Sequence, residues 1–373
     1  MLSFFNRNHK RILVVRLDRV GDVVLSTPVY HTLKGSFPDA FVGALVSSYT
    51  SPLLQGNPYI DAIIPDDPNG EDAEKKNFWK KVNEIRSYKF DTALLLMPTK
   101  RLAYMLFHAG IPYRVGVGHI LYEVITFMHG VSRREYNPLR HESDYMLDLA
   151  RKIGAKQIWT KPEIFLTGEE KESARKFLER KGFNTDKPII AIHPGSGHSA
   201  PNWGVERYAE LARMLSRNGW SVGSFGQVLV TGTKNETDIE EYFLRLGVET
   251  VKTTFSEISL RESLAVISQV SLLVSSSTGP MHFASAVGAA TVSMFCPLTA
   301  CSPKLWGPVG NTSRVILPPE DFCHTKCPGD PHVCTFGSGN EGITVGTVFE
   351  AATELLNKTE SAYDNSASHG QRR

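Results

Sequence analysis

Residues suited to phosphate chemistry occur in one stretch, residues 271–295, which reads SLLVSSSTGPMHFASAVGAATVSMF. Its pattern predicts a strand, a turn, a helix and a second strand in direct succession. Ser277, Thr278 and Gly279 fall at the start of the predicted helix, and His282 lies one turn later. Hydroxyl groups and free backbone N–H groups at a helix N-terminus suit a phosphate. A plain helix cap is the alternative for an isolated match.

A second turn of the same kind lies upstream and strengthens the phosphate interpretation. Residues 188–193, PIIAIH, predict a buried strand, and residues 205–218 predict a helix. The turn between them has glycines that let a ligand approach the backbone, and it contains Gly195, Ser196, Gly197 and His198. A further strand over 228–231 precedes Glu236, which stands just before a predicted helix over 237–246.

The first strand leads to a single aspartate. Residues 11–17, RILVVRL, predict a strand buried in a parallel sheet, and DRVGDVVLSTP then turns at 19–22 and opens a helix to about residue 34. Gly21 permits the tight turn, and Asp22 lies beside the carboxyl end of the strand, where open α/β sheets place their chemistry. A catalytic carboxylate and a helix-start aspartate that stabilises the dipole are both open at this point.

Strand and helix alternate along the chain, which predicts an α/β fold with parallel, doubly wound sheets. We expect an N-terminal domain over 1–160, a linker over 155–167 and a C-terminal domain over 161–358. The last helix is predicted over 345–357, and the polar residues 359–373 are predicted to be a disordered tail. Residues 119–131 have no clear pattern, and residues 222–227 resemble an insertion.

Composition excludes several classes of protein. The chain has 373 residues, 41% hydrophobic and 21% charged, with a net charge of +2, which fits a globular protein of two domains and not a general nucleic-acid binder. No apolar run approaches the roughly 18 residues of a membrane span, and no signal peptide is recognisable, so we expect a cytoplasmic location. The first 19 residues are locally basic and suit contact with an anionic membrane surface or with a cleft.

Motifs for metals and for other enzyme classes are missing. The spacing of Cys323, Cys327 and Cys334, with His324 and His332 nearby, does not match the usual zinc pairs, and we expect neither a metal nor a cofactor. The sequence has no phosphate loop, no G-x-G-x-x-G after the first strand, no G-x-S-x-G and no H-E-x-x-H. It also has no D-x-D pair to hold a divalent ion on a diphosphate. One carboxylate and two phosphate-suited turns therefore favour metal-free transfer of a group from a diphosphate.

Four segments together resemble the ADP-heptose:lipopolysaccharide heptosyltransferases, glycosyltransferase family nine. They are RILVVRLDRVGDVVLSTP, AIHPGSGHSAPNWGVERYAELA, VLVTGTKNE and SSSTGPMHFASAVGAATVSMF. The resemblance covers residues 11–356 and implies the GT-B fold, in which two Rossmann-like domains face a central cleft. It also implies that the last helix packs back on the N-terminal domain.

The resemblance implies an inverting, metal-independent transfer of a heptose or related sugar from an ADP-sugar, with Asp22 as general base. The acceptor is a lipid-anchored lipopolysaccharide core or a soluble saccharide, which places the enzyme in the cytoplasm with peripheral contact at the inner membrane. The residues implied to bind the donor are Gly195, Ser196, Gly197, His198, Glu236, Ser277, Thr278, Gly279 and His282. Weaker contacts to acceptor or phosphate are expected from Arg16, Arg19, Gly21, Arg207 and Lys304.

Two positions depart from the family pattern. Members usually have Lys or Arg two residues before the tryptophan, where this chain has Pro201, and many have Asp where it has Ser277. Losing a cation weakens a metal-free diphosphate site unless His198, Arg207, Arg19 or Lys304 replaces it. The alternatives are therefore a non-catalytic member that binds glycan or a partner protein, and a nucleotide-sugar epimerase or hydrolase on the same two-domain plan.

Overall fold

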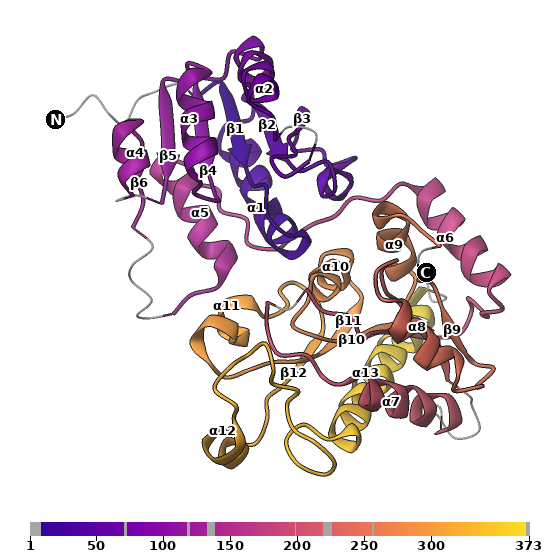
Figure 1. Cartoon of the computed structure of the whole chain (residues 1–373). Helices are drawn as coiled ribbons and strands as arrows, with labels where there is room; N and C mark the ends of the chain where they lie inside the picture. Colours follow the sequence, from indigo (N-terminus) through magenta and orange to yellow (C-terminus); the bar gives the residue numbers. More distant parts are fainter. Residues whose placement is uncertain are drawn as a thin grey trace. The chain divides into compact units, whose positions relative to one another are not determined.

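A computed structural model describes residues 9–70, 73–117, 120–132, 139–197, 199–218, 226–255 and 257–370. It divides into two compact units, Met1–Phe165 and Leu166–Arg373, each with its own sheet and helices (Figure 1). The division falls a few residues after the boundary predicted at residue 160.

The first unit is built on a parallel sheet of six strands in the order β3-β2-β1-β4-β5-β6. The strands are β1 (Arg11–Val15), β2 (Phe41–Val46), β3 (Ala62–Pro65), β4 (Thr92–Leu95), β5 (Tyr113–Gly116) and β6 (His129–Gly130). All strands are parallel, but β2 and β3 are added on one side of β1 and β4, β5 and β6 on the other, so the strand order reverses between β1 and β4. In open α/β sheets the crevice at the carboxyl ends of such strands is the usual ligand site.

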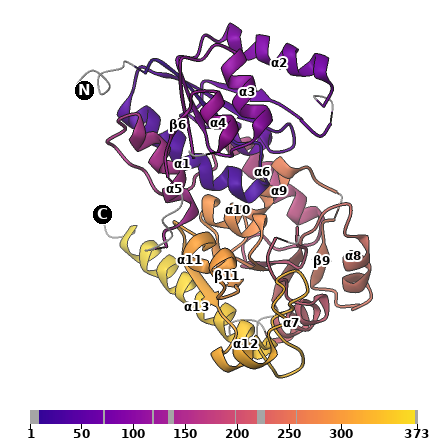
Figure 2. The same ribbon diagram turned by 60° about the vertical axis from the view of Figure 1, so that its left-hand side comes forward.

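Helices cover both faces of this sheet. They are α1 (Val20–Ser36), the short η1 (Ser51–Leu54), α2 (Lys75–Ser87), α3 (Lys100–His108), α4 (Leu121–Ile125) and α5 (Glu142–Lys152). Leu13 and Val15 pack with α2 and α3 in one core, and Figure 2 shows α3 lying between α2 and α4. Ile12 and Val14 point to the opposite face and are equally buried, as expected of a strand covered on both sides.

The second unit repeats this topology. Its parallel strands are β7 (Ile189–His193), β8 (Gln227–Val230), β9 (Val251–Thr253), β10 (Leu272–Ser276), β11 (Ala290–Met294) and β12 (Ser313–Ile316). Their order is β12-β11-β10-β7-β8-β9, so the reversal lies between β7 and β10. The helices are α6 (Gly168–Arg180), α7 (Val205–Asn218), α8 (Thr237–Leu244), α9 (Leu260–Ile267), α10 (Gly279–Val287), η2 (Thr299–Cys301), α11 (Pro303–Trp306), α12 (Glu320–Lys326) and α13 (Val345–Gly370).

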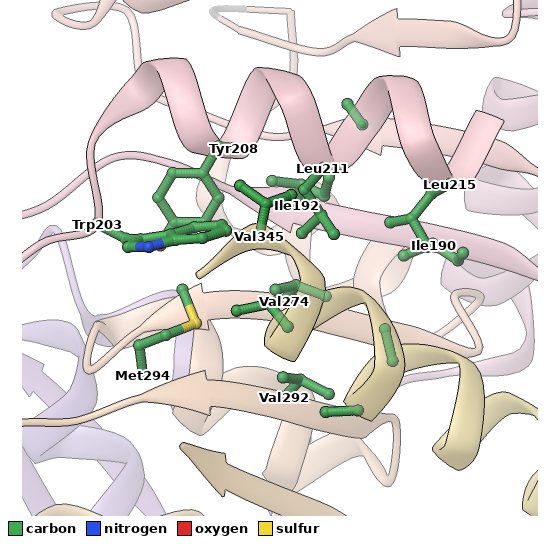
Figure 3. Close-up of a cluster of buried hydrophobic side chains, with 14 of the residues drawn as sticks. Ile190, Ile192, Trp203, Tyr208, Leu211, Leu215, Val274, Val292, Met294 and Val345 are labelled. Atoms are coloured by element: carbon green, nitrogen blue, oxygen red, sulfur yellow. The ribbon is translucent and has the colours of Figure 1, made fainter. Parts of the chain in front are cut away.

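A buried cluster joins α7 and α13 to the strands of the second sheet. Figure 3 shows Leu211 and Leu215 of α7 above Ile190 and Ile192, with the start of α13 beside them. Trp203 is fully buried at one end, where its ring meets Tyr208 edge-on at 5.0 Å. Its backbone N–H donates to Ser276 Oγ at 3.0 Å, and Tyr208 Oη lies 2.9 Å from the same oxygen. These bonds fix the chain entering α7 to the end of β10.

The prediction of two doubly wound halves is confirmed, and most strands and helices lie within a few residues of the expected ranges. The edge strands β6, β9 and β12 were missed, as were α4, α11 and α12, because these elements are short and lack a clear period. The capping box of Ser259 and Glu262 starts α9 at Leu260. The predicted insertion at 222–227 lies mostly outside the described residues.

The structure adds detail to the expected linker and to the last helix. The expected linker packs on α1, since the N–H groups of Trp159 and Glu163 donate to Thr32 Oγ1 and Thr27 Oγ1, both at 2.9 Å. Helix α13 continues to Gly370, so helical backbone occupies most of the segment predicted as a disordered tail. No proline or glycine interrupts the chain between Gly346 and Gly370. Since α13 packs on α7 and on β10–β12, its packing on the first unit stays a prediction.

Ser276→Ala is expected to lower the free energy of unfolding by about 1–3 kcal/mol, because it leaves the buried Trp203 N–H and Tyr208 hydroxyl without their partner. The matched control is Ser275→Ala. Ser275 is equally buried on the same strand, but its hydroxyl has no hydrogen-bond partner among the described residues, so its loss is expected to cost less. Urea unfolding of both variants checks the difference, and equal losses would contradict it.

Candidate functional site

Asp22 is held by a buried arginine at the carboxyl end of β1. Arg16 directly follows β1, and its Nη2 donates to Asp22 Oδ1 at 2.6 Å and lies 3.0 Å from Asp18 Oδ2. Its Nη1 donates to the carbonyl of Leu96 at 3.1 Å and lies 3.8 Å from Glu142 Oε1. Three carboxylates therefore surround one guanidinium.

The backbone explains why these groups meet. Arg16 follows β1 and Leu96 follows β4, so the two residues end neighbouring strands at the reversal point of the sheet. Arg16 N–H also donates to Leu45 O at 2.9 Å, which extends the pairing with β2. Helix α1 begins at Val20, which places Asp22 in its first turn without a separate turn at residues 19–22. Gly21 is thus helical, with no positive φ, and its part in a tight turn was wrongly predicted.

Burial raises the pKa of Asp22 above its ordinary value of 3.8. The positive charge of Arg16 lowers this pKa, whereas the charges of Asp18 and Glu142 raise it, and the net shift is upward. A carboxylate that is desolvated and crowded by like charges is a stronger base than an exposed one. Asp22 can therefore accept a proton while Arg16 keeps its side chain in one orientation.

In the second unit, the N-cap residue of α10 makes no side-chain hydrogen bond to the helix. Thr278 has the extended backbone of an N-cap residue but makes no side-chain bond to the first turn of α10. Its Oγ1 is buried and has no hydrogen-bond partner among the described residues. The first turn has no acidic residue, and His282 is buried one turn in. An anion can thus be met both by the helix dipole and by the Thr278 hydroxyl.

Gly195 and Glu236 are in close contact at the same edge of the sheet. A Cβ atom on Gly195 would lie 2.0 Å from Glu236 Oε1, so only glycine fits without moving that carboxylate. Glu236 Oε2 accepts hydrogen bonds from Thr233 N–H at 2.7 Å and Thr233 Oγ1 at 2.9 Å. Burial lowers the pKa of neighbouring His193, while the charge of Glu236 acts in the opposite direction.

The donor-binding candidates thus gather at one edge of the second sheet. Gly195 follows β7, Glu236 follows β8 and Ser277 follows β10, and β7 pairs with both other strands. Ser196 and Gly197 continue the turn after β7, and Gly279 is the first residue of α10. His198 lies outside the described residues.

The residues expected to make weaker contacts have different environments. Arg16 is buried and bound to carboxylates, and Arg207 donates from Nη1 to Ile343 O at 2.8 Å and approaches two further carbonyls of the loop before α13. Both guanidinium groups are therefore already used within the protein, which does not favour their predicted contacts with acceptor or phosphate. Lys304 is exposed on α11, beyond the carboxyl end of β11, and Arg19 is exposed before α1.

Sequence reasoning missed the contributions of Glu142 and Thr233. Glu142 opens α5, far from Arg16 in sequence, and no local pattern links the two. Thr233 precedes Glu236 by three residues, a spacing that signals a local side-chain contact. Within the described ranges, no group of three or more His, Cys, Asp or Glu side chains is placed to hold a metal ion.

Comparison with known proteins assigns the chain to a family. The family model "Glycosyltransferase family 9 (heptosyltransferase)" matches residues 78–329. The chain belongs to glycosyltransferase family 9. Lipopolysaccharide heptosyltransferase 2 of Escherichia coli is 25% identical to it over 319 residues, which cover 82% of this chain and 87% of that protein.

Solved structures of the same family share the fold. The glycosyl transferase family 9 protein of Veillonella parvula aligns with a TM-score of 0.81 at 21% identity, covering 95% of this chain and 99% of the other. The ADP-heptose lps heptosyltransferase II of E. coli aligns with a TM-score of 0.72 at 22% identity, covering 94% and 99%. The family 9 member described here therefore has the GT-B fold, as the sequence predicted, and is a glycosyltransferase.

Asp22→Asn is expected to make this family 9 protein more stable at neutral pH, because the pKa of Asp22 is raised in the folded state. A raised carboxyl pKa means that the folded protein loses stability relative to the unfolded chain as pH rises from 3.8 through the folded-state value. The gain in Tm of the variant over the unaltered protein should therefore grow from acidic to neutral pH.

The matched control is Asp148→Asn in the same unit. Burial acts to raise the pKa of Asp148, but hydrogen bonds from Arg140 and Arg151 outweigh it and lower the pKa. Asp148 thus contributes stability that is present above its ordinary pKa and lost as pH falls, so Asp148→Asn should lower Tm at neutral pH. The same sign for both variants at neutral pH would contradict this assignment.

Proposed function

We propose that this protein transfers a heptose, or a related sugar, from an ADP-sugar to a lipopolysaccharide core or a similar saccharide acceptor. Family 9 membership and the heptosyltransferases of E. coli to which the chain is similar support the donor and acceptor classes. The single observation that carries the catalytic part is Asp22, a partly buried carboxylate with a raised pKa at the point where the strand order of the first sheet reverses.

In this proposal Asp22 is the general base. An acceptor hydroxyl loses its proton to an Oδ atom of Asp22 as its oxygen bonds to the anomeric carbon of the donor sugar. The bond between that carbon and the diphosphate oxygen breaks at the same time, and its electron pair leaves with ADP. Attack opposite the leaving group inverts the anomeric centre. Arg16 positions the base, and it offsets the negative charge until the proton arrives.

The second unit holds the donor. Glu236 Oε2 accepts hydrogen bonds from Thr233. We propose that Oε1, which lies against Gly195, accepts hydrogen bonds from the hydroxyl groups of the ribose. The N-terminus of α10 receives the diphosphate, with Thr278, Gly279 and His282 as contacts. Backbone N–H groups that point at the leaving group would stabilise its charge as it develops, which is why the reaction is proposed to need no metal ion.

Pro201 stands where family members usually have Lys or Arg. The proposal therefore requires that a cation from elsewhere in the chain binds the donor phosphates. Pro201 is buried beside the α7 chain entry, where the neighbouring Asn202 donates from Nδ2 to Pro194 O at 2.8 Å. Lys304 is an exposed lysine beyond the carboxyl end of β11, the strand next to β10. We propose Lys304 as the replacement, because Arg207 is already used by carbonyl groups. Without such a cation, the non-catalytic alternative is the better one.

None of the described helices is long and apolar enough to cross a membrane. We propose a cytoplasmic enzyme that meets a lipid-anchored acceptor at the membrane surface.

Asp22→Asn should lower turnover of ADP-heptose with a core saccharide acceptor by about 100- to 10,000-fold, the usual contribution of a general base, while donor binding is retained. Asp148→Asn should keep its activity, since Asp148 pairs with Arg140 and Arg151 and not with Arg16. Release of ADP and formation of the glycosylated acceptor are both measured, with a reaction lacking acceptor beside them.

Normal turnover in Asp22→Asn would exclude Asp22 as the base. Rapid release of free sugar without acceptor would instead favour a hydrolase, and a change of sugar configuration on intact donor would favour an epimerase. Absence of turnover with every donor would favour a non-catalytic protein.

A further inference from the structure

Half of the exposed large hydrophobic side chains among the described residues lie on neighbouring helices of the first unit. Six of the twelve fall between residues 79 and 127, namely Trp79, Phe107, Leu121, Val124, Ile125 and Phe127. We call these six residues the apolar patch. Their helices are adjacent, since α3 contacts both α2 and α4 and lies between them in both ribbon views (Figures 1 and 2).

Ring contacts link the aromatic residues of the apolar patch. The Trp79 ring lies 5.0 Å from that of His108, which lies 5.5 Å from Phe107. Phe107 in turn lies 6.5 Å from Phe127, which follows α4. The exposed aromatic side chains of α2, of α3 and of the residue two places after α4 are therefore connected, unlike the isolated exposed residues that are common on any protein.

Helix α4 has the reverse of the pattern that suits water. Leu121, Val124 and Ile125 are exposed, whereas the only charged residue of the helix, Glu123, is buried. A surface helix in water normally turns its charged residue outward and its apolar residues inward. The observed orientation suits an apolar environment outside α4.

Phe127, which follows α4, combines an exposed ring with an unfavourable backbone conformation. Its φ of 53° lies in the left-handed region, where glycine is preferred. Phe127 N–H donates to Val124 O at 3.0 Å and Met128 N–H to Glu123 O at 2.9 Å, which is the bonding of a helix ending that usually has glycine in this place. A phenylalanine that is 74% exposed here has both a strained backbone and an exposed ring. Strain of this kind gathers at functional positions.

Exposed basic side chains lie on α2, the helix of Trp79, and just after its end. Lys76, Lys80, Arg86 and Lys89 of residues 75–89 are exposed, and we call them the basic rim. Arg86 donates from Nη2 to His108 O at 2.6 Å, which joins the rim to the apolar patch. Lys76 pairs with Glu74, and the one acidic residue within 75–89, Glu84, is bound to Lys81. Two of the basic residues near the N-terminus have other contacts, since Arg11 stacks on Phe41 and Arg16 is buried.

We propose that the apolar patch and the basic rim form a docking surface for a bilayer that contains anionic phospholipids. Leucine, phenylalanine and tryptophan side chains enter the boundary between headgroups and acyl chains, and lysines beside them attract anionic headgroups. We choose an anionic bilayer as the partner of this surface because its charge complements the basic rim and because α4 exposes its apolar residues and buries Glu123. The proposal also rests on the proposed function, in which the acceptor is anchored in a lipid layer.

Vesicle flotation tests the docking surface without donor or acceptor, so its outcome does not depend on the proposed reaction. The full chain should float with vesicles of one part phosphatidylglycerol to three parts phosphatidylethanolamine, and less with neutral phosphatidylcholine vesicles or at high salt. Phe127→Gly should weaken binding about tenfold by removing one inserted aromatic side chain. The same substitution should raise Tm by about 2–4 °C because it relieves the backbone.

Leu244→Ser is the matched control, since Leu244 is 63% exposed on α8 of the second unit, and it should leave vesicle binding unchanged. Turnover with a lipid-free acceptor should be the same for Phe127→Gly and the unaltered chain. Equal flotation of the Phe127→Gly and Leu244→Ser variants would overturn the proposal. Sedimentation that shows a dimer dissociated by Phe127→Gly, without vesicle binding, would assign the surface to a second copy instead and would also overturn it.

Discussion

The ion pair between Arg16 and Asp22 is the interaction on which the catalytic site depends. A guanidinium that is buried without partners costs several kcal/mol, so Arg16 fixes its surroundings. The parallel sheet places Arg16 between the ends of β1 and β4, where Leu96 O accepts one of its hydrogen bonds. Asp18, Asp22 and Glu142 then have to share the remaining positive charge. Because three carboxylates share one guanidinium, the charge of Asp22 is only partly compensated. Arg16 thus holds Asp22 in place while the pKa of Asp22 stays raised.

The second unit repeats the topology with a different kind of polar contact. Ser276 ends β10 and binds Trp203 and Tyr208, which ties the chain after β7 to the strand that leads into α10. The turns at Gly195 and Thr278 thus lie next to neutral hydrogen bonds, and the Thr278 hydroxyl has no hydrogen-bond partner among the described residues. In the proposed reaction the same topology supplies a base in the first unit and an anion site in the second, because different residues follow the corresponding strands.

The sequence predicts the framework better than the contacts. Continuous apolar runs such as Ile189–His193 predict strands buried on both faces, and their spacing fixes the parallel topology and the strand ends. Edge strands such as β12 are short and partly exposed, so their pattern is weak. The part of Arg16 could not be predicted, because it depends on Leu96 and Glu142, which are distant in sequence. Arg207 was predicted at a phosphate, but tertiary packing brings the carbonyl of Ile343 to it first.

The exposed side chains of α4 could not be predicted either, since residues 119–131 have no clear period. Only the structure shows that Glu123 points inward and Phe127 outward. Once the structure shows which residues of α4 face inward, its outward-facing apolar residues can be recognised as unsuited to contact with water alone. The catalytic framework and the surface of α2, α3 and α4 belong to the same unit, which is consistent with an acceptor approached from a lipid layer.

The most direct measurement of the central claim, a metal-free site for an ADP-sugar, is calorimetric titration of the purified protein with ADP, UDP and GDP, each with and without EDTA. The matching nucleotide sugars follow. The proposed function predicts binding of the ADP series in preference to the others, with an affinity that EDTA does not change, because the proposed contacts from α10 and the Glu236 carboxylate need no metal ion. Absence of binding by every nucleotide, or binding that EDTA abolishes, would contradict that claim.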